Sequence, residues 1–183
     1  MPEKRLFIAI PLPDDIIQLL VAYQSIIVHP NLAWVKPENL HITVHFLGNI
    51  QENEIHNIEE KLASLVTFPS FSLQGKEIKA INRRGKIDMI WAGFQESNEF
   101  IILATQMAQI LRLPLTHPPL PHITLARVKR NKVVKLRDSS FQLTNPMILQ
   151  VKKVGLYESN LTPHGPVYKV LNEWHLKDSG YDC

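Results

Sequence analysis

The sequence lacks the features that mark secreted, membrane-spanning and cysteine-stabilised proteins. Its single cysteine, Cys183, excludes an intrachain disulfide and a cysteine metal cluster, which fits a reducing compartment. No stretch reaches the roughly 18 to 20 uninterrupted apolar residues of a membrane span, and the apolar run near the start is too short for the core of a signal peptide. We therefore expect a cytoplasmic protein that does not act at a membrane.

The composition also lacks the bias of a disordered chain and any large excess of charge. Of the 183 residues 45% are apolar and 20% are charged, which is typical of a soluble globular protein. The net charge of +3 permits an anionic partner without requiring one. A chain of this length forms one domain or two small lobes, and no linker-like segment divides it. We expect a monomer.

The spacing of apolar residues predicts three helices among a larger number of strands. Helices are expected over about 14–27, 53–66 and 98–111, the last with Ser97 as its N-cap. Strands are expected at 5–10, 32–35, 40–47, 71–81, 87–94, 122–128, 147–157 and 167–174. Because most of these strands are joined by tight turns, we predict an α+β fold with largely antiparallel sheet.

A tripeptide repeat connects the two halves of the chain. His41-Ile42-Thr43 recurs 81 residues later as His122-Ile123-Thr124. The same offset aligns further strand, helix and loop positions: 8–10 with 89–91, 19–20 with 100–101, Ile26 with Met107, and Pro37 with Pro118. The repeat predicts a single domain over residues 1–183, built from two related lobes.

Each triplet has the chemistry of half a catalytic site. In an extended strand, residues i and i+2 lie on one face about 6.5 to 7 Å apart, so each triplet presents an imidazole beside a hydroxyl while its isoleucine faces the opposite layer. Two triplets that face each other would supply one imidazole to accept a proton, one imidazolium to donate a proton, and hydroxyls for phosphoryl oxygens. This set suits phosphodiester chemistry and requires no metal.

The motifs and their flanks resemble a known family. The two His-x-Thr motifs resemble those of the two-histidine phosphoesterase superfamily, and the segments 5–10, 34–48, 121–127 and 156–161 are similar to those of the RNA 2′,3′-cyclic phosphodiesterases, long called 2′-5′ RNA ligases. The resemblance covers nearly the whole chain. It implies a bilobal α+β fold in which two largely antiparallel sheets are related by pseudo-twofold symmetry, with helices on the outside and a central groove.

The resemblance also implies an activity and a role for each motif residue. The reaction would be hydrolysis of an RNA or nucleotide 2′,3′-cyclic phosphate to the 2′-phosphate, with no cofactor and no metal. His41 would protonate the departing 3′-oxygen and His122 would activate water. Thr43, Thr124 and Arg127 would hold the phosphate. The partner would be an RNA with a 2′,3′-cyclic phosphate end or a small cyclic nucleotide.

Two positions depart from this simple pattern. Arg127 lies five residues after His122, so a regular strand would turn it to the opposite face, and its role requires a bulge, a strand end or a long side chain reaching round. His45 lies at even offsets from His41 and Thr43, so we expect it on the catalytic face, where it would narrow the groove or touch the substrate. A packed or solvated histidine is the more common alternative.

The remaining candidates have ordinary structural interpretations. We expect surface positions for His29, His56 and His175, and loop positions for His117 and His164, with lining of the groove as their alternative. Core positions are expected for Trp34, Trp91 and Trp174, with base-stacking platforms as the alternative. The basic segment 129–137 and the pair Lys152-Lys153 fit a rim for RNA and a solvated surface equally well. The histidines show no metal-ligand spacing, and the acidic residues do not cluster with them.

Three other functions remain open at this point. The same His-Thr pairs would serve 2′-5′ RNA ligation, which is the first. They would also serve cleavage of 2′-5′ oligonucleotides or of another cyclic nucleotide diester, which is the second. A non-catalytic module that binds RNA ends is the third, although such a module would be expected to have lost a motif histidine, and both are present.

Overall fold

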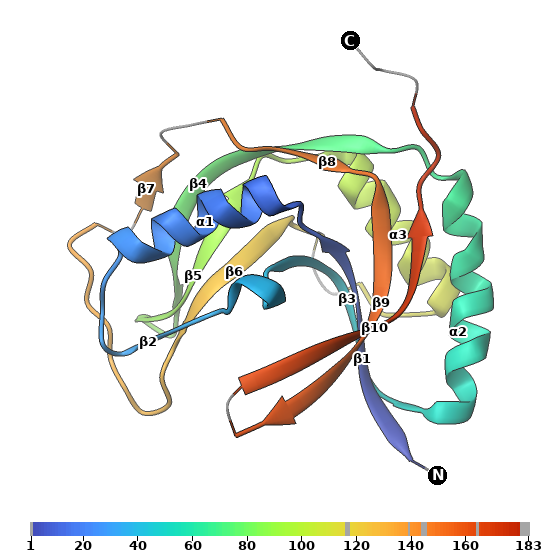
Figure 1. Cartoon of the computed structure of the whole chain (residues 1–183), viewed down its shortest axis with the longest axis horizontal. Coiled ribbons are helices and arrows are strands. Elements are labelled where there is room, and N and C mark those ends of the chain that lie inside the picture. Colours follow the sequence, from blue (N-terminus) through green and yellow to red (C-terminus); the bar gives the residue numbers. More distant parts are fainter. Residues whose placement is uncertain (1, 116–117, 139, 144–145, 164, 180–183) are drawn as a thin grey trace.

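The fold is α+β, with a largely antiparallel sheet flanked by three α-helices (Figure 1). The computed structural model describes residues 2–115, 118–138, 140–143, 146–163 and 165–179. The helices are α1 (Asp14–Ile26), α2 (Ile55–Leu62) and α3 (Asn98–Leu111). The strands are β1 (Glu3–Pro11), β2 (Leu32–Trp34), β3 (His41–Gln51), β4 (Phe71–Arg83), β5 (Lys86–Phe94), β6 (His122–Val128), β7 (Ser140–Gln142), β8 (Ile148–Val151), β9 (Lys153–Thr162) and β10 (Gly165–His175).

The sheet consists of two halves that meet at a single pair of residues. Its strand order is β10-β9-β1-β3-β6-β5-β4-β7, with β2 added beside β6 and β8 beside β4. Between β3 and β6, the register contains only the pair Ile42 with Ile123, and both side chains are fully buried. We call β1, β3, β9 and β10 the β1 half, and β2 with β4 to β8 the β5 half. The middle residues of the two triplets therefore form the junction.

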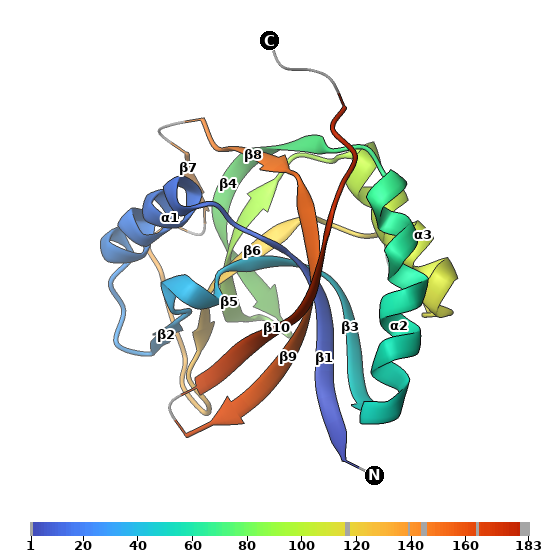
Figure 2. The ribbon, with the colours of Figure 1, turned by 45° about the vertical axis from the view of Figure 1, so that its right-hand side comes forward.

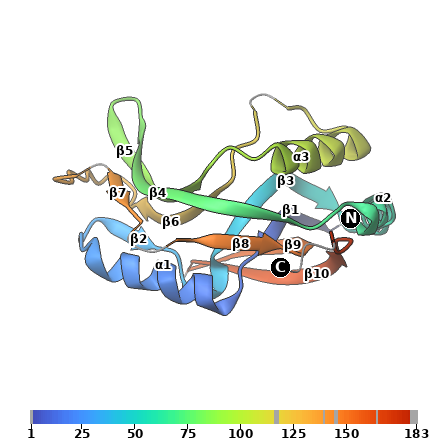
Figure 3. The same cartoon turned by 90° about the horizontal axis from the view of Figure 1, so that it is seen from above.

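The helices on the two sides of the sheet connect the two halves. Gln24 of α1 donates a hydrogen bond to the Leu125 carbonyl of β6, at 3.2 Å. His45 of β3 donates to the Ala104 carbonyl of α3, at 2.7 Å. Each helix thus contacts a strand of the half other than the one it follows in the chain. Figure 3 shows α1 and α3 on opposite sides of the molecule, and Figure 2 shows α2 beside α3.

The expected cap of α3 is present, whereas α2 is shorter than the helix expected from the sequence. The Ser97 hydroxyl accepts a hydrogen bond from the Phe100 amide at 3.2 Å, which confirms Ser97 as the N-cap of α3. The helix expected over 53–66 is shorter than predicted, because α2 covers only its middle and 3₁₀ turns η2 (Glu52–Glu54) and η3 (Ala63–Thr67) form its two ends.

The observed strands differ from the expected ones in three main respects. The strand predicted over 147–157 is two strands, because β8 pairs with β4 whereas β9 pairs with β1 and β10, and the chain changes halves at Lys152. The short strand β7 was not predicted. Strand β3 continues past 47 to Gln51, because Leu47 is an extra residue opposite β1 and Gly48 takes a positive φ of 77° that suits glycine.

The structure bears on the expected absence of a membrane span, and it leaves two other expectations untested. Among the described residues, no helix combines the length and the apolar character needed to cross a membrane. The cytoplasmic location and the pseudo-twofold relation of the two lobes stay predictions.

Candidate active site

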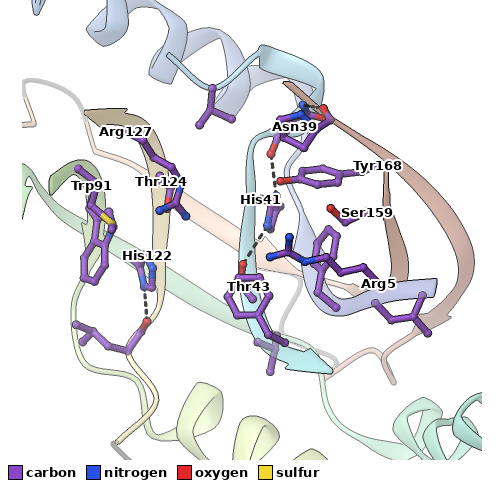
Figure 4. Close-up of a pocket in the computed structure, with 18 of the residues that line it drawn as sticks. Arg5, Asn39, His41, Thr43, Trp91, His122, Thr124, Arg127, Ser159 and Tyr168 are labelled. Atoms are coloured by element: carbon purple, nitrogen blue, oxygen red, sulfur yellow. Dashed lines mark hydrogen bonds between the residues drawn. The ribbon is translucent and has the colours of Figure 1, made fainter. Parts of the chain in front are cut away.

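The two triplets line one groove at the junction of the halves. Because β3 and β6 run antiparallel and pair at Ile42 and Ile123, the histidine and threonine of each triplet flank that pair. All four side chains line an open pocket with a volume of about 730 Å³ (Figure 4). His41 and Thr43 form one wall, and His122 and Thr124 form the facing wall.

Both imidazoles are held in the same way by the carbonyl two residues earlier. His41 Nδ1 lies 2.7 Å from the Asn39 carbonyl oxygen, and His122 Nδ1 lies 2.9 Å from that of Leu120. Since a carbonyl only accepts, Nδ1 carries a proton in each ring and Nε2 remains for the groove. His41 Nε2 lies 3.0 Å from the Thr43 hydroxyl, which donates to it when the ring is neutral.

Burial favours the neutral form of both histidines. Desolvation lowers the pKa of His41, the bond to the Asn39 carbonyl opposes this, and the charges of His122 and Arg127 lower it further. Desolvation likewise lowers the pKa of His122, opposed by the Leu120 carbonyl and assisted by Arg127. A bound anion between the two rings would counteract Arg127 and favour protonation of an imidazole.

Arg127 reaches the groove because β6 contains a bulge. Trp91 of β5 pairs with Thr124 whereas Ile90 pairs with Ala126, so Leu125 is an extra residue on β6. The extra residue reverses the alternation of faces and brings Arg127 to the face of Thr124. This is one of the arrangements expected from the odd spacing, and Figure 4 shows Arg127 beside Thr124 at the pocket.

The expectation that His45 lies on the catalytic face is wrong. On β3, Ile8 of β1 pairs with His45 and Ala9 pairs with Thr43, so Val44 is an extra residue. This bulge turns His45 away from the groove to its bond with α3, while Phe46 takes the groove-facing position. The two bulges lie 81 residues apart, at equivalent positions of the repeat.

Aromatic rings contact both catalytic candidates. Trp91 stacks on His122 with ring centroids 3.7 Å apart, whereas Phe7 and Tyr168 lie 5.0 and 5.3 Å from His41. A core position is confirmed for Trp174, and Trp34 packs partly buried against the core. The expectation of a core position is wrong for Trp91, which is half-buried and lines the groove.

The positive charges at the groove come from three arginines in different elements. Arg5 of β1, Arg83 of β4 and Arg127 line the pocket, and the described lining residues include no aspartate or glutamate. The basic segment 129–137 and the pair Lys152-Lys153, the alternatives from sequence, do not line it.

The other histidines that the structure describes do not line the pocket. His29 accepts a bond from the Asn31 amide, His56 pairs with Glu60 at 3.2 Å, and His175 is exposed. His117 and His164, as well as Cys183, lie outside the described residues. Within the described part of the chain, no group of three or more metal-ligating side chains comes together, and the absence of a metal from the reaction stays a prediction.

Sequence reasoning missed several groove residues. Ser159 of β9 and Tyr168 of β10 line the wall beside His41, and Arg5 extends into the pocket from β1 (Figure 4). Arg5 lies two residues before Phe7 in β1, and this even spacing would have indicated that both side chains lie on the same face of the strand. Ser159 and Tyr168 lie beyond the repeat, so the 81-residue offset gave no signal for them.

Comparisons with known proteins agree with this arrangement. The model of the "LigT like Phosphoesterase" family matches residues 10–91 and 96–168. The RNA 2′,3′-cyclic phosphodiesterase of Methanocaldococcus jannaschii is 30% identical over 175 residues, which covers 93% of this chain and 99% of the relative. The enzyme of the same name from Thermotoga maritima is 36% identical over 151 residues, which covers 76% of this chain and 77% of the relative.

A solved structure extends the comparison to the fold. The crystal structure of the protein TT0787 of Thermus thermophilus superposes with a TM-score of 0.82 at 27% identity, over 96% of this chain and 99% of that one. Together, the family match over most of the chain and these relatives show that the chain belongs to the LigT-like phosphoesterase family.

Proposed function

We propose that the protein hydrolyses 2′,3′-cyclic phosphate ends of RNA, or 2′,3′-cyclic nucleotides, to the 2′-phosphate by general acid–base catalysis without a metal. The observation that carries the proposal is the matched anchoring of two histidines at Nδ1, which leaves both Nε2 atoms for one groove. The curated relatives named RNA 2′,3′-cyclic phosphodiesterase support the choice of substrate.

The proposed reaction is one displacement at phosphorus. His122 Nε2 accepts a proton from water while the water oxygen bonds to phosphorus. The bond between phosphorus and the 3′-oxygen breaks, and that oxygen receives a proton from His41 Nε2. The product carries a free 3′-hydroxyl and a 2′-phosphate, and the two histidines have exchanged protonation states. A proton exchange with solvent then restores the starting state.

The hydroxyls and Arg127 would stabilise the charge that develops on the phosphoryl oxygens. The Thr124 hydroxyl forms no hydrogen bond within the described part of the chain, so it is available to the substrate. The Thr43 hydroxyl would follow the proton on His41, donating to the neutral ring and accepting from the charged one. Arg127 supplies a guanidinium, which binds phosphoryl oxygens with two parallel bonds.

The direct test is turnover of 2′,3′-cyclic AMP in excess EDTA, with the products separated from each other by chromatography. We expect 2′-AMP from the wild type, and a loss of about 100-fold or more in kcat for His41→Ala and for His122→Ala. Absence of turnover on every cyclic-phosphate end, or 3′-AMP as the product, would overturn the proposal. Parallel assays of 2′-5′ ligation and of 2′-5′ oligonucleotide cleavage separate it from the other reactions open to these residues.

A further inference from the structure

The proposed reaction fixes the orientation in which an RNA end lies in the groove. If His41 protonates the departing 3′-oxygen, the terminal nucleoside lies on the His41 side, against β1, β9 and β10, and the attacking water lies on the side of His122 and Trp91. The RNA chain then leaves the site on the His41 side, through the 5′-oxygen of that nucleoside. Groups on the β1 half are therefore the ones that meet the next phosphodiester.

Three hydrogen-bond donors form a row across this part of the β1 half. Ser159 pairs with Tyr168 between β9 and β10. The pairing of β1 with β9 ends at Leu6 and Glu158, and Arg5 and Ser159 are the residues next to that last pair. All three side chains line the groove, and Figure 4 shows them on the His41 side. Among the described residues, none of them has a hydrogen bond or ion pair.

Two acidic residues beside this row are engaged with a lysine on the opposite face of the strands. Lys4 binds Glu52 at 2.9 Å and approaches Glu158 at 3.7 Å. Because Lys4 and Arg5 are consecutive in a strand, their side chains point to opposite faces. Among the described residues no carboxylate lines the groove, so a ligand is the anion that the guanidinium of Arg5 is placed to meet.

The charge of Arg5 acts less on the two catalytic histidines than that of Arg127 does. The charge of Arg127 lowers the pKa of His41, His122 and Tyr168, whereas Arg5 is among the causes only for Tyr168, whose pKa is raised first of all by burial. Tyr168 in turn lies edge-on to His41, at 5.3 Å between ring centroids. Arg127 is thus placed for the phosphate under attack, and Arg5 for a charge one step along the ligand.

We propose that Arg5, with the hydroxyls of Ser159 and Tyr168, binds the phosphodiester on the 5′ side of the terminal nucleotide, and that the enzyme therefore prefers RNA ends to cyclic mononucleotides. The inference rests on the proposed function. A guanidinium that gains a phosphate gives charge-assisted hydrogen bonds, which at this solvent-accessible site correspond to about a tenfold gain in kcat/KM. The gain lies in KM, since the contact is the same before and during the reaction.

The test compares four substrates at one salt concentration: adenosine 2′,3′-cyclic phosphate, the same nucleotide with a 5′-phosphate, ApA with a 2′,3′-cyclic phosphate end, and that dinucleotide with an uncharged methylphosphonate linkage. We expect the second and third to exceed the first by about tenfold in kcat/KM, and the fourth to resemble the first. In Arg5→Gln, the advantage of the two charged substrates falls to about one.

Arg83→Gln is the matched control, because Arg83 lines the same groove from the β5 half. It should keep the preference for the charged substrates. If the preference is lost in Arg83→Gln and kept in Arg5→Gln, the RNA runs in the other direction and the inference is wrong. It is also wrong if the wild type treats all four substrates alike or if Arg5→Gln slows all four equally. If no cyclic phosphate is turned over at all, it is the proposed function that fails.

Discussion

At the scale of single residues, the account depends on two histidines that must differ in charge although their surroundings are alike. Each donates Nδ1–H to a carbonyl two residues earlier, and each has its pKa lowered first of all by burial. Without substrate both rings therefore favour the neutral form, which suits the base and not the acid. The phosphate anion itself supplies the charge that favours a protonated His41.

This gives a prediction for the pH dependence. The base must be neutral and the acid protonated, so kcat/KM follows a bell whose two limbs report the free enzyme. Since the pKa of each histidine is lowered, both limbs should lie below the ordinary histidine value, as macroscopic constants of the pair. In kcat, the alkaline limb should move to higher pH, because the bound anion stabilises charged His41.

Initial rates from pH 4 to 9 at constant ionic strength measure both profiles. Arg127→Gln provides the comparison: removing its charge should move both limbs of kcat/KM to higher pH, whatever the loss in rate. A wild-type kcat/KM profile centred above the ordinary histidine pKa would contradict this electrostatic description.

At the scale of elements, two bulges decide which side chains reach the groove. The extra residues Val44 on β3 and Leu125 on β6 turn His45 outwards and Arg127 inwards. The spacing of His45 from His41 and of Arg127 from His122 can be read from the sequence. For Arg127, the odd spacing itself indicated an irregular strand. For His45, the spacing gave no sign of an irregular strand, because an even spacing agrees with a regular one. Only the pairing of β3 with β1 reveals the extra residue.

Other elements show the same limit of sequence reasoning. Strand β6 and the start of α3 have the predicted bounds because local signals mark them: the proline-rich loop before His122, and Ser97 as a cap. The break between β8 and β9 at Lys152 has no such local signal, since it arises from pairing with strands that are distant in the chain.

The position of His45 yields a prediction that separates stability from activity. Because His45 contacts α3 and not the groove, His45→Ala should lower the free energy of unfolding by about 1 kcal/mol and leave kcat/KM unchanged. Urea denaturation followed by circular dichroism measures the first quantity. Thr43→Val, two residues away on the groove face, should show the reverse: near-native stability and a large loss of kcat. A catalytic defect in His45→Ala with unchanged stability would contradict the bulge in β3.

At the scale of the whole molecule, two lobes form one structure because each completes the other. Ile42 and Ile123 join the halves, α1 bonds to β6, and α3 bonds to β3. The chain then returns through β9, which pairs with β1, and β10, which pairs with β9. The two triplets of the sequence repeat line one groove. The repeat gave no indication that the C-terminal strands would extend the β1 half, because those strands have no counterpart in the repeat.

This interdependence predicts that the first 96 residues do not fold without the rest of the chain. A fragment of residues 1–96 retains β1, β3, β4 and β5 but loses β6, which α1 contacts, and β9, which covers the edge of β1. We expect it to lack a dispersed ¹H–¹⁵N NMR spectrum and a cooperative thermal transition, whereas the full chain unfolds in a single transition seen by all probes. A well-dispersed spectrum from the fragment would show that the first 96 residues fold without β6 and β9, and would contradict this interdependence.

The central claim is that His41 acts as the acid and His122 as the base, and one substrate tests it most directly. In a cyclic nucleotide with sulfur in place of the 3′-oxygen, the leaving group is a thiolate, whose conjugate thiol has a pKa of about 8.5, so its departure needs no proton. Single-turnover rates of His41→Ala should then recover to within about tenfold of the wild type, because only the acid has been made unnecessary, while those of His122→Ala stay at least about 100-fold lower. Recovery of His122→Ala instead, or equal defects in both variants on the sulfur substrate, would contradict the account.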